Sequence, residues 1–328
     1  MRVMVLGGTG FIGRHAAAAL RARGHTVVIG TRHPKRAPGK LPPALRPGLP
    51  GVELRETHFE SLTTRYIWKP LLEDVDVVVN AVGILRERGG ETYDRVHNMA
   101  PAALGEACAR LGLRLVHVSA LGLRPGARSR FLRSKLIAER KIMASGADYS
   151  IVRPSLLDGE GGYGAVWLRR IAAWPVHFYP SNARGRMAPL DVRDLGEALA
   201  VLCERGGEGR REVELGGSAK RTMADYLGAL RVREGKPGDD RPALRVGIPP
   251  ILARLAAHVC DLLHFSPFSY GHFELMRRDN LPQMNMLTSL IGRAPTPVGR
   301  EPRKQRPAYV PPLTVFGRIR FGIRELLH

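Results

Sequence analysis

The chain has 328 residues, of which 44% are hydrophobic and 25% charged, and its formal net charge is +21. This hydrophobic content can fill a sizeable core, which excludes an intrinsically disordered chain. The three cysteines are odd in number and widely spaced, which argues against a disulfide framework or a zinc site, and we predict no metal.

The positive charge predicts attraction to polyanions such as nucleic acid, anionic lipid or an acidic protein. Arginine outnumbers lysine, and a drift of composition toward arginine would produce the same charge on an ordinary solvated surface. No nucleic-acid-binding motif or ladder of aromatic and basic residues accompanies it, so nucleic acid is not an expected partner. The apolar run 248–265 is broken by two prolines and several polar residues and is not predicted to span a bilayer.

The first predicted strand, Val3–Leu6, runs into a glycine-rich turn and then a helix-forming segment that ends near Arg23. Because the chain opens directly on this strand, we expect no leader segment and a cytoplasmic protein. Glycine at such a turn permits a tight backbone and close approach to a pyrophosphate, toward which the helix aims free N–H groups. A second strand at 26–30 completes a unit of about 30 residues, which favours dinucleotide binding over an ordinary turn. The predicted cofactor contacts here are Gly7, Thr9, Gly10, Phe11, Ile12 and Gly13.

The end of the second strand carries Arg32, with further basic residues close behind and no Asp or Glu between Gly24 and Gly51. An acidic residue at this point would bind the ribose hydroxyls of NAD, whereas arginine can pair with the 2′-phosphate of NADP. We therefore predict NADP(H) as the cofactor, although Arg32 is also what an arginine-rich surface would carry by chance. The following segment, to Gly51, is predicted to be a loop.

Further strands and helices alternate along the chain, a pattern that predicts a doubly wound α/β fold with a parallel sheet. Strands are predicted at 52–56, 75–79, 114–119 and 149–153, and helices at 61–72, 91–111 and 128–145. Ligands bind such sheets at the carboxyl ends of the strands. There we place Ala81, Val82 and Gly83 after the fourth strand, Ser119 at the end of the fifth, and Pro154 and Ser155 after the sixth, with Asn98, Phe131 and Lys135 on neighbouring helices.

With these residues in view, the chain resembles the short-chain dehydrogenase/reductase superfamily in its extended or atypical branch, which has a Rossmann-type sheet. The segments 264–268 and 274–280 are similar to the lineage of the NADPH-binding accessory subunit of respiratory complex I and its bacterial relatives. The resemblance covers nearly the whole chain. It implies a nicotinamide nucleotide as ligand and a respiratory or quinone-pathway protein as partner.

The resemblance also implies which catalytic residues of the superfamily this chain keeps and which it lacks. In active members a Tyr four residues before the Lys is the acid or base, the Lys lowers its pKa and holds the nicotinamide ribose, and a Ser polarises the carbonyl. This chain keeps Ser119 and Lys135 but has Phe131 at the Tyr position. A phenyl ring has no proton to give, so a proton transfer worth about 10²–10⁴-fold is lost. His58-Phe59 stands where relatives commonly have an Asp near the adenine.

Two substitutes for this chemistry can be weighed. Tyr93, Tyr149 and Tyr163 are candidates for a displaced acid. His117 and Ser119 share a strand face, but no orienting carboxylate or nucleophile elbow accompanies them, so a hydrolytic pair is not expected.

We expect an NADP(H)-binding domain at 1–155, a smaller, interleaved substrate-side lobe at 156–300, and a basic tail at 301–328. On a helical projection Leu313–His328 has an apolar stripe edged by arginines. This stripe predicts that the segment binds either the anionic inner surface of the cell membrane or the protein's own domain. Three functions remain open. They are a non-catalytic or weakly catalytic nucleotide-binding protein that serves a respiratory or quinone-related membrane assembly, an NADP-dependent oxidoreductase with a displaced acid, and a basic module that binds polyanions.

Overall fold

The computed structural model describes residues 1–205, 211–234, 242–263 and 266–299. Its centre is a sheet of seven parallel strands in the order β11-β6-β5-β4-β1-β2-β3. These strands are β1 (Arg2–Leu6), β2 (Thr26–Thr31), β3 (Val52–Glu56), β4 (Val77–Asn80), β5 (Arg114–Val118), β6 (Asp148–Pro154) and β11 (Arg211–Leu215). Strand order reverses between β1 and β4, where doubly wound sheets open a crevice for a ligand. The predicted doubly wound sheet is confirmed.

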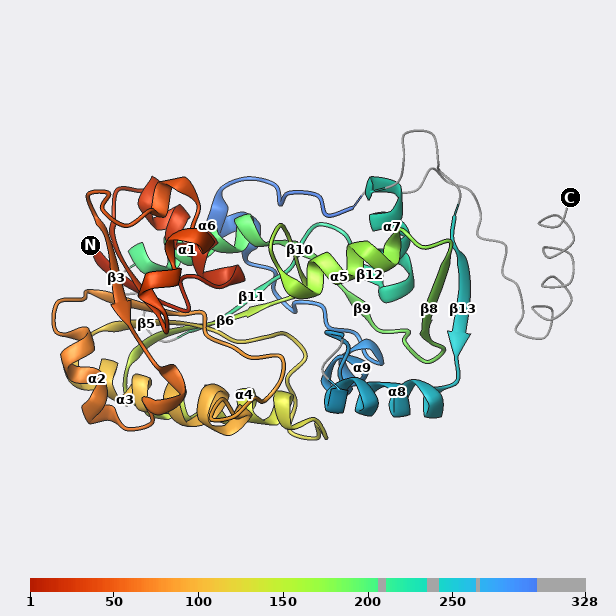
Figure 1. Ribbon diagram of the computed structural model, residues 1–328, viewed down its shortest axis with the longest axis horizontal. Helices are drawn as coiled ribbons and strands as arrows, with labels where there is room; N and C mark the ends of the chain where they lie inside the picture. Colours follow the sequence, from red (N-terminus) through yellow and green to blue (C-terminus); the bar gives the residue numbers. More distant parts are fainter. Residues whose placement is uncertain (206–210, 235–241, 264–265, 300–328) are drawn as a thin grey trace, which may run out of the picture.

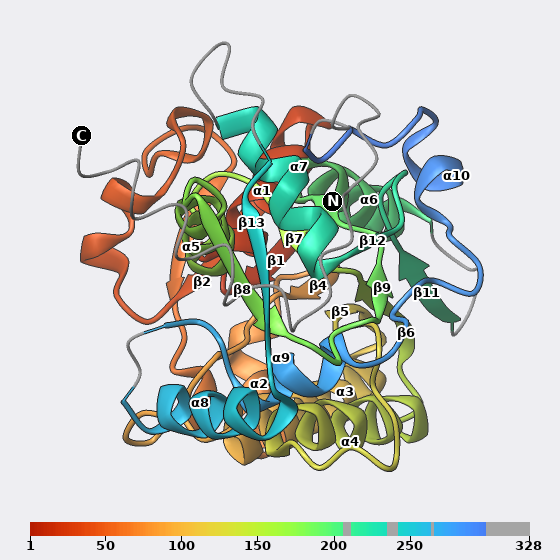
Figure 2. The ribbon, with the colours of Figure 1, turned by 90° about the vertical axis from the view of Figure 1, so that its right-hand side faces the viewer.

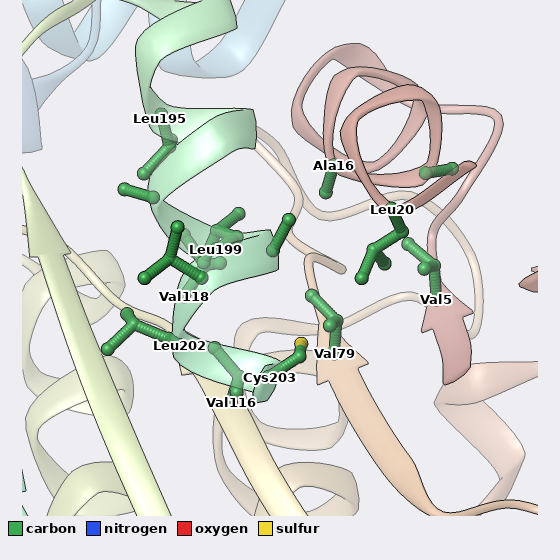
Figure 3. Close-up of a cluster of buried hydrophobic side chains, with 14 of the residues drawn as sticks. Val5, Ala16, Leu20, Val79, Val116, Val118, Leu195, Leu199, Leu202 and Cys203 are labelled. Atoms are coloured by element: carbon green, nitrogen blue, oxygen red, sulfur yellow. The ribbon is translucent and has the colours of Figure 1, made fainter. Parts of the chain in front are cut away.

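Helices cover both faces of the sheet (Figure 1). One face carries α1 (Phe11–Ala22) and α6 (Val192–Glu204), and the other carries α2 (Arg65–Leu72), α3 (Ala100–Leu111) and α4 (Arg130–Ala144). Side chains alternate between the two cores: Val3 and Val5 face α1 and α6, while Met4 and Leu6 face α2 and α3. Figure 3 shows Val5, Val79, Val116 and Val118 against Leu20 of α1 and Leu195 and Leu199 of α6.

Most of the elements after β6 build the right-hand part of Figure 1, whereas α6, β11 and α10 (Leu287–Ile291) belong to the sheet and its core. Helices α5 (Tyr163–Ala172) and α7 (Met223–Glu234) pack together, and β8 (Val176–Pro180) pairs in parallel with β13 (Leu244–Ile248). Helices α8 (Pro250–Leu263) and α9 (Tyr270–Met276) lie along the edge of this part, while α10 returns to the core beside α6 (Figure 2). Short two-residue strands complete it: β7 (Leu157–Asp158) with β10 (Leu190–Asp191), and β9 (Arg186–Met187) with β12 (Arg221–Thr222).

The part of the chain after residue 155 also contributes to the main sheet, because β11 pairs in parallel with β6 and α6 covers the sheet beside α1. Two details of the predicted elements need correction. The helix predicted at 61–72 begins only at Arg65, after a 3₁₀ turn at Phe59–Ser61. The helix predicted at 91–111 is interrupted, since a π-helical turn at Arg95–Met99 precedes α3.

The predicted amphipathic tail, Leu313–His328, lies outside the described residues. Within the described part of the chain, no helix combines the length and the apolar content that a bilayer crossing requires. Cys108, Cys203 and Cys260 are buried free thiols.

Candidate functional site

The turn between β1 and α1 has the geometry that its glycines predict. Gly7 has φ +71°, a conformation that favours glycine, and its carbonyl accepts from the N–H of Gly10 at 2.8 Å. A Cβ at Gly13 would collide with the Gly7 carbonyl, so this third glycine lets α1 pack close to the turn. Gly10 caps α1 without a side-chain hydrogen bond, and the first turn holds no acidic residue. The positive end of the helix is therefore available to an anion.

A cavity of about 620 Å³ opens at the carboxyl ends of β1, β2, β4, β5 and β6. Fourteen of the predicted site residues line it: Gly7, Thr9, Gly10, Phe11, Ile12, Arg32, Ala81, Val82, Gly83, Ser119, Phe131, Lys135, Pro154 and Ser155. Gly13 and Asn98 do not line the cavity. The fold thus gathers residues from five strand ends into one space.

At one end of the cavity Arg32 forms an ion pair that the local sequence does not predict. Its Nη1 lies 2.6 Å from Oε1 of Glu91, which belongs to the connection between β4 and α3. Both residues line the cavity. The acidic residue missing from the segment after β2 is therefore supplied by a distant part of the chain.

The residues expected at the reactive end line the same cavity, Ser119 directly after β5 and Phe131 and Lys135 in the first half of α4. Ser119 Oγ is buried and has no hydrogen-bonding partner among the described residues. Lys135 is 9% exposed, and its Nζ lies 6.0 Å from the centre of the Phe131 ring. Burial lowers the pKa of Lys135 to about 8, against the opposing charge of Glu139.

These features fit a nicotinamide dinucleotide. The glycine turn and the start of α1 suit a pyrophosphate, Arg32 suits a phosphate or Glu91 a ribose hydroxyl, and Lys135 and Ser119 offer donors at the far end. When bound, the nicotinamide ring would supply or accept a hydride. The chain's own residues would hold the two ends of the nucleotide and shield its ring from water.

Comparison with known proteins decides the class. A family model described as NAD(P)H-binding matches residues 7–170, which is half of the chain. The chain belongs to this NAD(P)H-binding family. Its sequence is 27% identical over 202 residues to a ceramide reductase of Caulobacter vibrioides, covering 61% of this chain and 60% of that protein. It is 24% identical over 225 residues to the mitochondrial NADH dehydrogenase (ubiquinone) 1 alpha subcomplex subunit 9 of Dictyostelium discoideum, covering 68% and 61%.

These matches span about six-tenths of the length of either relative. Among solved structures, an NADPH-dependent quinone oxidoreductase of Escherichia coli complexed with NADPH superimposes with a TM-score of 0.67 at 16% identity. That similarity covers 91% of this chain and 97% of the other and demonstrates a shared fold.

In this NAD(P)H-binding protein, Phe131 lies in an aromatic cluster. Its ring centre lies 5.8 Å from Tyr93, 5.3 Å from His97 and 6.3 Å from His272. The Tyr93 hydroxyl donates to the carbonyl of Leu85 at 2.8 Å. Tyr149 packs in the core on the α2 and α3 face. Of the three tyrosines considered for a displaced acid, Tyr163 lines the cavity, and it is 57% exposed.

His97 occupies the wall position that the sequence pattern assigned to its neighbour Asn98. The backbone N–H of Ile84 donates to its Nε2 at 3.0 Å, while its buried Nδ1 has no partner among the described residues. Asn98 instead donates to Asp94 at 2.6 Å. The π-helical turn explains the change, since its wider turn shifts the facing residues from the positions an α-helix predicts. Burial, with Lys135 adding to it, holds the pKa of His97 well below its usual value.

The cavity continues past the strand ends into the C-terminal part of the molecule. Most of its wall there is apolar and comes from α5, β9, the start of α7 and the region around α9: Trp167, Leu168, Met187, Met223, Phe268, Leu275 and Met276. These residues could not be assigned from the sequence, because nothing local marks an apolar side chain as cavity lining rather than core. After β3, where the resemblance implies the adenine contact, Phe59 and Glu60 line the cavity, while His58 pairs with Glu56 at 2.9 Å.

Proposed function

We propose that this protein binds NADP(H) in preference to NAD(H) and holds it without the proton transfer that reductases of this fold use. The observation that carries the proposal is Phe131 beside Lys135 in the cavity wall, a position from which no proton can be donated. The sequence similarity to a complex I subunit supports a role as a nucleotide-binding component of a respiratory or quinone-related membrane assembly.

Nucleotide titration and a substrate screen test this function. We expect NADPH to bind, and its oxidation with aldehydes, ketones and quinones to stay at background. Phe131→Tyr restores measurable oxidation with nucleotide affinity unchanged, because only a hydroxyl is added, and Phe131→Leu serves as the matched control without one. Robust turnover by the unmodified protein would overturn the non-catalytic role, whereas failure to bind either nucleotide would overturn the cofactor assignment.

One observation favours a second candidate, an active NADP-dependent oxidoreductase with a displaced acid. The pKa of Lys135 is lowered to about 8, so its ammonium group is an acid near neutral pH. In carbonyl reduction the carbonyl carbon would accept a hydride and its oxygen a proton from Lys135 Nζ. Turnover that is abolished by Lys135→Met, with an apparent pKa near that of the lysine, would select this candidate.

We also propose that the protein is cytoplasmic and attaches peripherally to an anionic membrane surface. The support is its net charge of +21 and the basic, apolar-striped segment Leu313–His328. Sedimentation with anionic and neutral vesicles, at low and high salt, tests the attachment. A chain that ends at Pro312 should lose salt-sensitive pelleting if this segment carries the contact.

A further inference from the structure

Helix α8 has its apolar side turned outward. It lies at the edge of the C-terminal part of the molecule (Figures 1 and 2). Small residues, Ala253, Ala257 and Cys260, make its buried face. Six large apolar side chains are exposed on it: Ile251 (82%), Leu252 (56%), Leu255 (60%), Val259 (40%), Leu262 (78%) and Leu263 (62%).

These six residues form one continuous stripe. At 100° per residue they fall within an arc of about 120°, opposite the buried alanines, and the exposed Ala256 extends it. Arg254 and His258 occupy one flank of this arc, where both contact the ring of Tyr270 on α9. An apolar stripe this wide is normally the face that a soluble protein buries, so its exposure marks an interaction surface.

The arginine flank of α8 leads into a second cavity, of about 420 Å³. Its lining includes five arginines, Arg124, Arg128, Arg254, Arg277 and Arg278, and a single carboxylate, Glu274. That carboxylate is already engaged by Arg124 at 2.6 Å and by the backbone N–H groups of Arg128 and Ser129. Among the described residues, no carboxylate pairs with the guanidinium groups of Arg128, Arg254, Arg277 or Arg278. The cavity therefore carries a clear excess of positive charge.

We propose that α8 and this arginine cavity form a docking surface for an anionic phospholipid bilayer. The apolar stripe enters the boundary between headgroups and acyl chains, and the arginine cavity receives lipid phosphate. The surface extends the peripheral attachment proposed above, on which it rests, but it lies on a folded helix and not in the tail.

Charge decides against the other occupants. A two-fold dimer would use the same patch on both copies and bring two arginine clusters into one interface. The C-terminal segment carries Arg318, Arg320 and Arg324 beside its apolar residues, so it has the same sign as the cavity. A bilayer with anionic headgroups is complementary to both parts of the surface, since its acyl chains suit the apolar stripe of α8 and its phosphates suit the arginine cavity.

Site-specific fluorescence on the full chain tests the proposal. Leu262→Cys is labelled with an environment-sensitive thiol dye, since the native cysteines are buried. The matched control is Ile67→Cys on α2, an exposed apolar position at the opposite end of the molecule (Figure 1). The probes are vesicles of phosphatidylcholine alone and of phosphatidylcholine mixed with phosphatidylglycerol. NADPH binding by each labelled variant confirms that it is folded.

We expect a blue shift at position 262 with the mixed vesicles, none with phosphatidylcholine alone, and none at position 67. Arg128→Gln combined with Arg278→Gln should weaken this response at least about tenfold, because each basic residue near anionic lipid contributes to binding. Pelleting without a blue shift at 262 would overturn the proposal while leaving attachment through the tail. A label at 262 that is already shielded without vesicles would assign the stripe to a second copy or to the chain's own C-terminal segment.

Discussion

At the scale of single residues, two side chains define the ends of the cavity. Arg32 meets Glu91, a carboxylate 59 positions later in the chain (91 − 32), at 2.6 Å. An NADP 2′-phosphate would have to compete with that carboxylate for the guanidinium group, whereas the ribose hydroxyls of NAD could accept a hydrogen bond from Arg32 and donate one to Glu91. Cofactor preference therefore depends on both members of the pair.

Substitutions at the two members of this pair should move the affinity for NADPH in opposite directions. Arg32→Ala is expected to weaken NADPH binding by roughly ten- to a hundredfold, the equivalent of one charge-assisted hydrogen bond. Glu91→Gln should strengthen NADPH binding and leave NADH binding unchanged or weaker. Calorimetric titration measures both. Glu60→Gln, which alters a cavity carboxylate that does not contact Arg32, is the control, and equal effects of the two glutamine variants would contradict the competition.

Lys135 lies at the other end of the cavity, and its buried charge lowers the free energy of unfolding of the nucleotide-free protein. Its pKa falls from 10.5 unfolded to about 8 folded, so the folded state loses the proton first and stability rises as pH increases between these values. Lys135→Met should stabilise the protein by on the order of 3 kcal/mol at pH 7, a gain that fades toward pH 10.5. Urea unfolding followed by circular dichroism measures it. The exposed Lys141 on the same helix provides a control, Lys141→Met, and a gain that did not change with pH would refute the burial argument.

At the scale of elements, the contact between α1 and α6 depends on Gly196. A Cβ at this position would lie 2.7 Å from the carbonyl oxygen and 2.8 Å from the carbonyl carbon of His15, atoms of a helix backbone that cannot rotate away. The glycine therefore determines how closely α6 approaches α1. Because α1 follows the turn at Gly7–Gly13, this packing also holds that turn in place.

Gly196→Ala should destabilise the protein although alanine favours helix formation. The propensity gain is about 1 kcal/mol, while overpacking typically costs about 1–3 kcal/mol, so the clash is expected to prevail. Gly228→Ala in α7 is the control, because the nearest atom to its new Cβ would be the flexible end of Arg245 at 3.5 Å. Chemical denaturation should give opposite signs for the two variants. A stabilised Gly196→Ala protein would show that the helices separate freely.

At the scale of the whole molecule, three imidazoles lie around the cavity and Lys135: His97 and His117 are buried, and His272, which is half-buried, lines the cavity. Burial lowers the pKa of His117 to about 3 and of His272 to about 4, and holds that of His97 well below its usual value, with Lys135 adding to the effect for His97 and His117. Above pH 6.5 all three are neutral in both states. Below pH 6.5 these histidines become protonated in the unfolded chain but stay neutral in the folded protein, so the protein loses stability as the pH falls.

The protein should therefore be sensitive to mild acid. Each such histidine contributes about 1.4 kcal/mol per pH unit, which gives up to about 4 kcal/mol per unit for the three between pH 6.5 and about 5. Denaturation midpoints across this interval measure the slope. His272→Gln should reduce the slope by about a third, while His33→Gln, at an exposed position, should leave it unchanged. A flat profile would mean that these imidazoles are hydrated.

Most of the fold and most of the cavity lining follow from local patterns in the sequence. The spacing Gly7-x-x-Gly10-x-x-Gly13 acts within one turn, and Val77 to Val79 form a strand buried on both faces. Phe131 and Lys135 are four residues apart, which places them on one face of any α-helix. Patterns of this kind are decided by backbone geometry over a few residues, so the sequence alone determined the Gly7–Gly13 turn, the parallel sheet and the presence of Phe131 one helical turn before Lys135.

Only the tertiary structure decided the contacts between distant segments. The π-helical turn before α3 brings His97 to the wall in place of Asn98, and the fold carries Glu91 to Arg32. Pairing with β6 makes β11 part of the main sheet, although α5 and β8 lie between the two strands along the chain. The exposed apolar stripe of α8 is another feature that only the structure shows, since the same apolar periodicity would occur in a helix whose stripe is buried. Contacts between segments far apart in the chain depend on how the whole protein packs. The local spacing of residues does not specify which of these segments become neighbours.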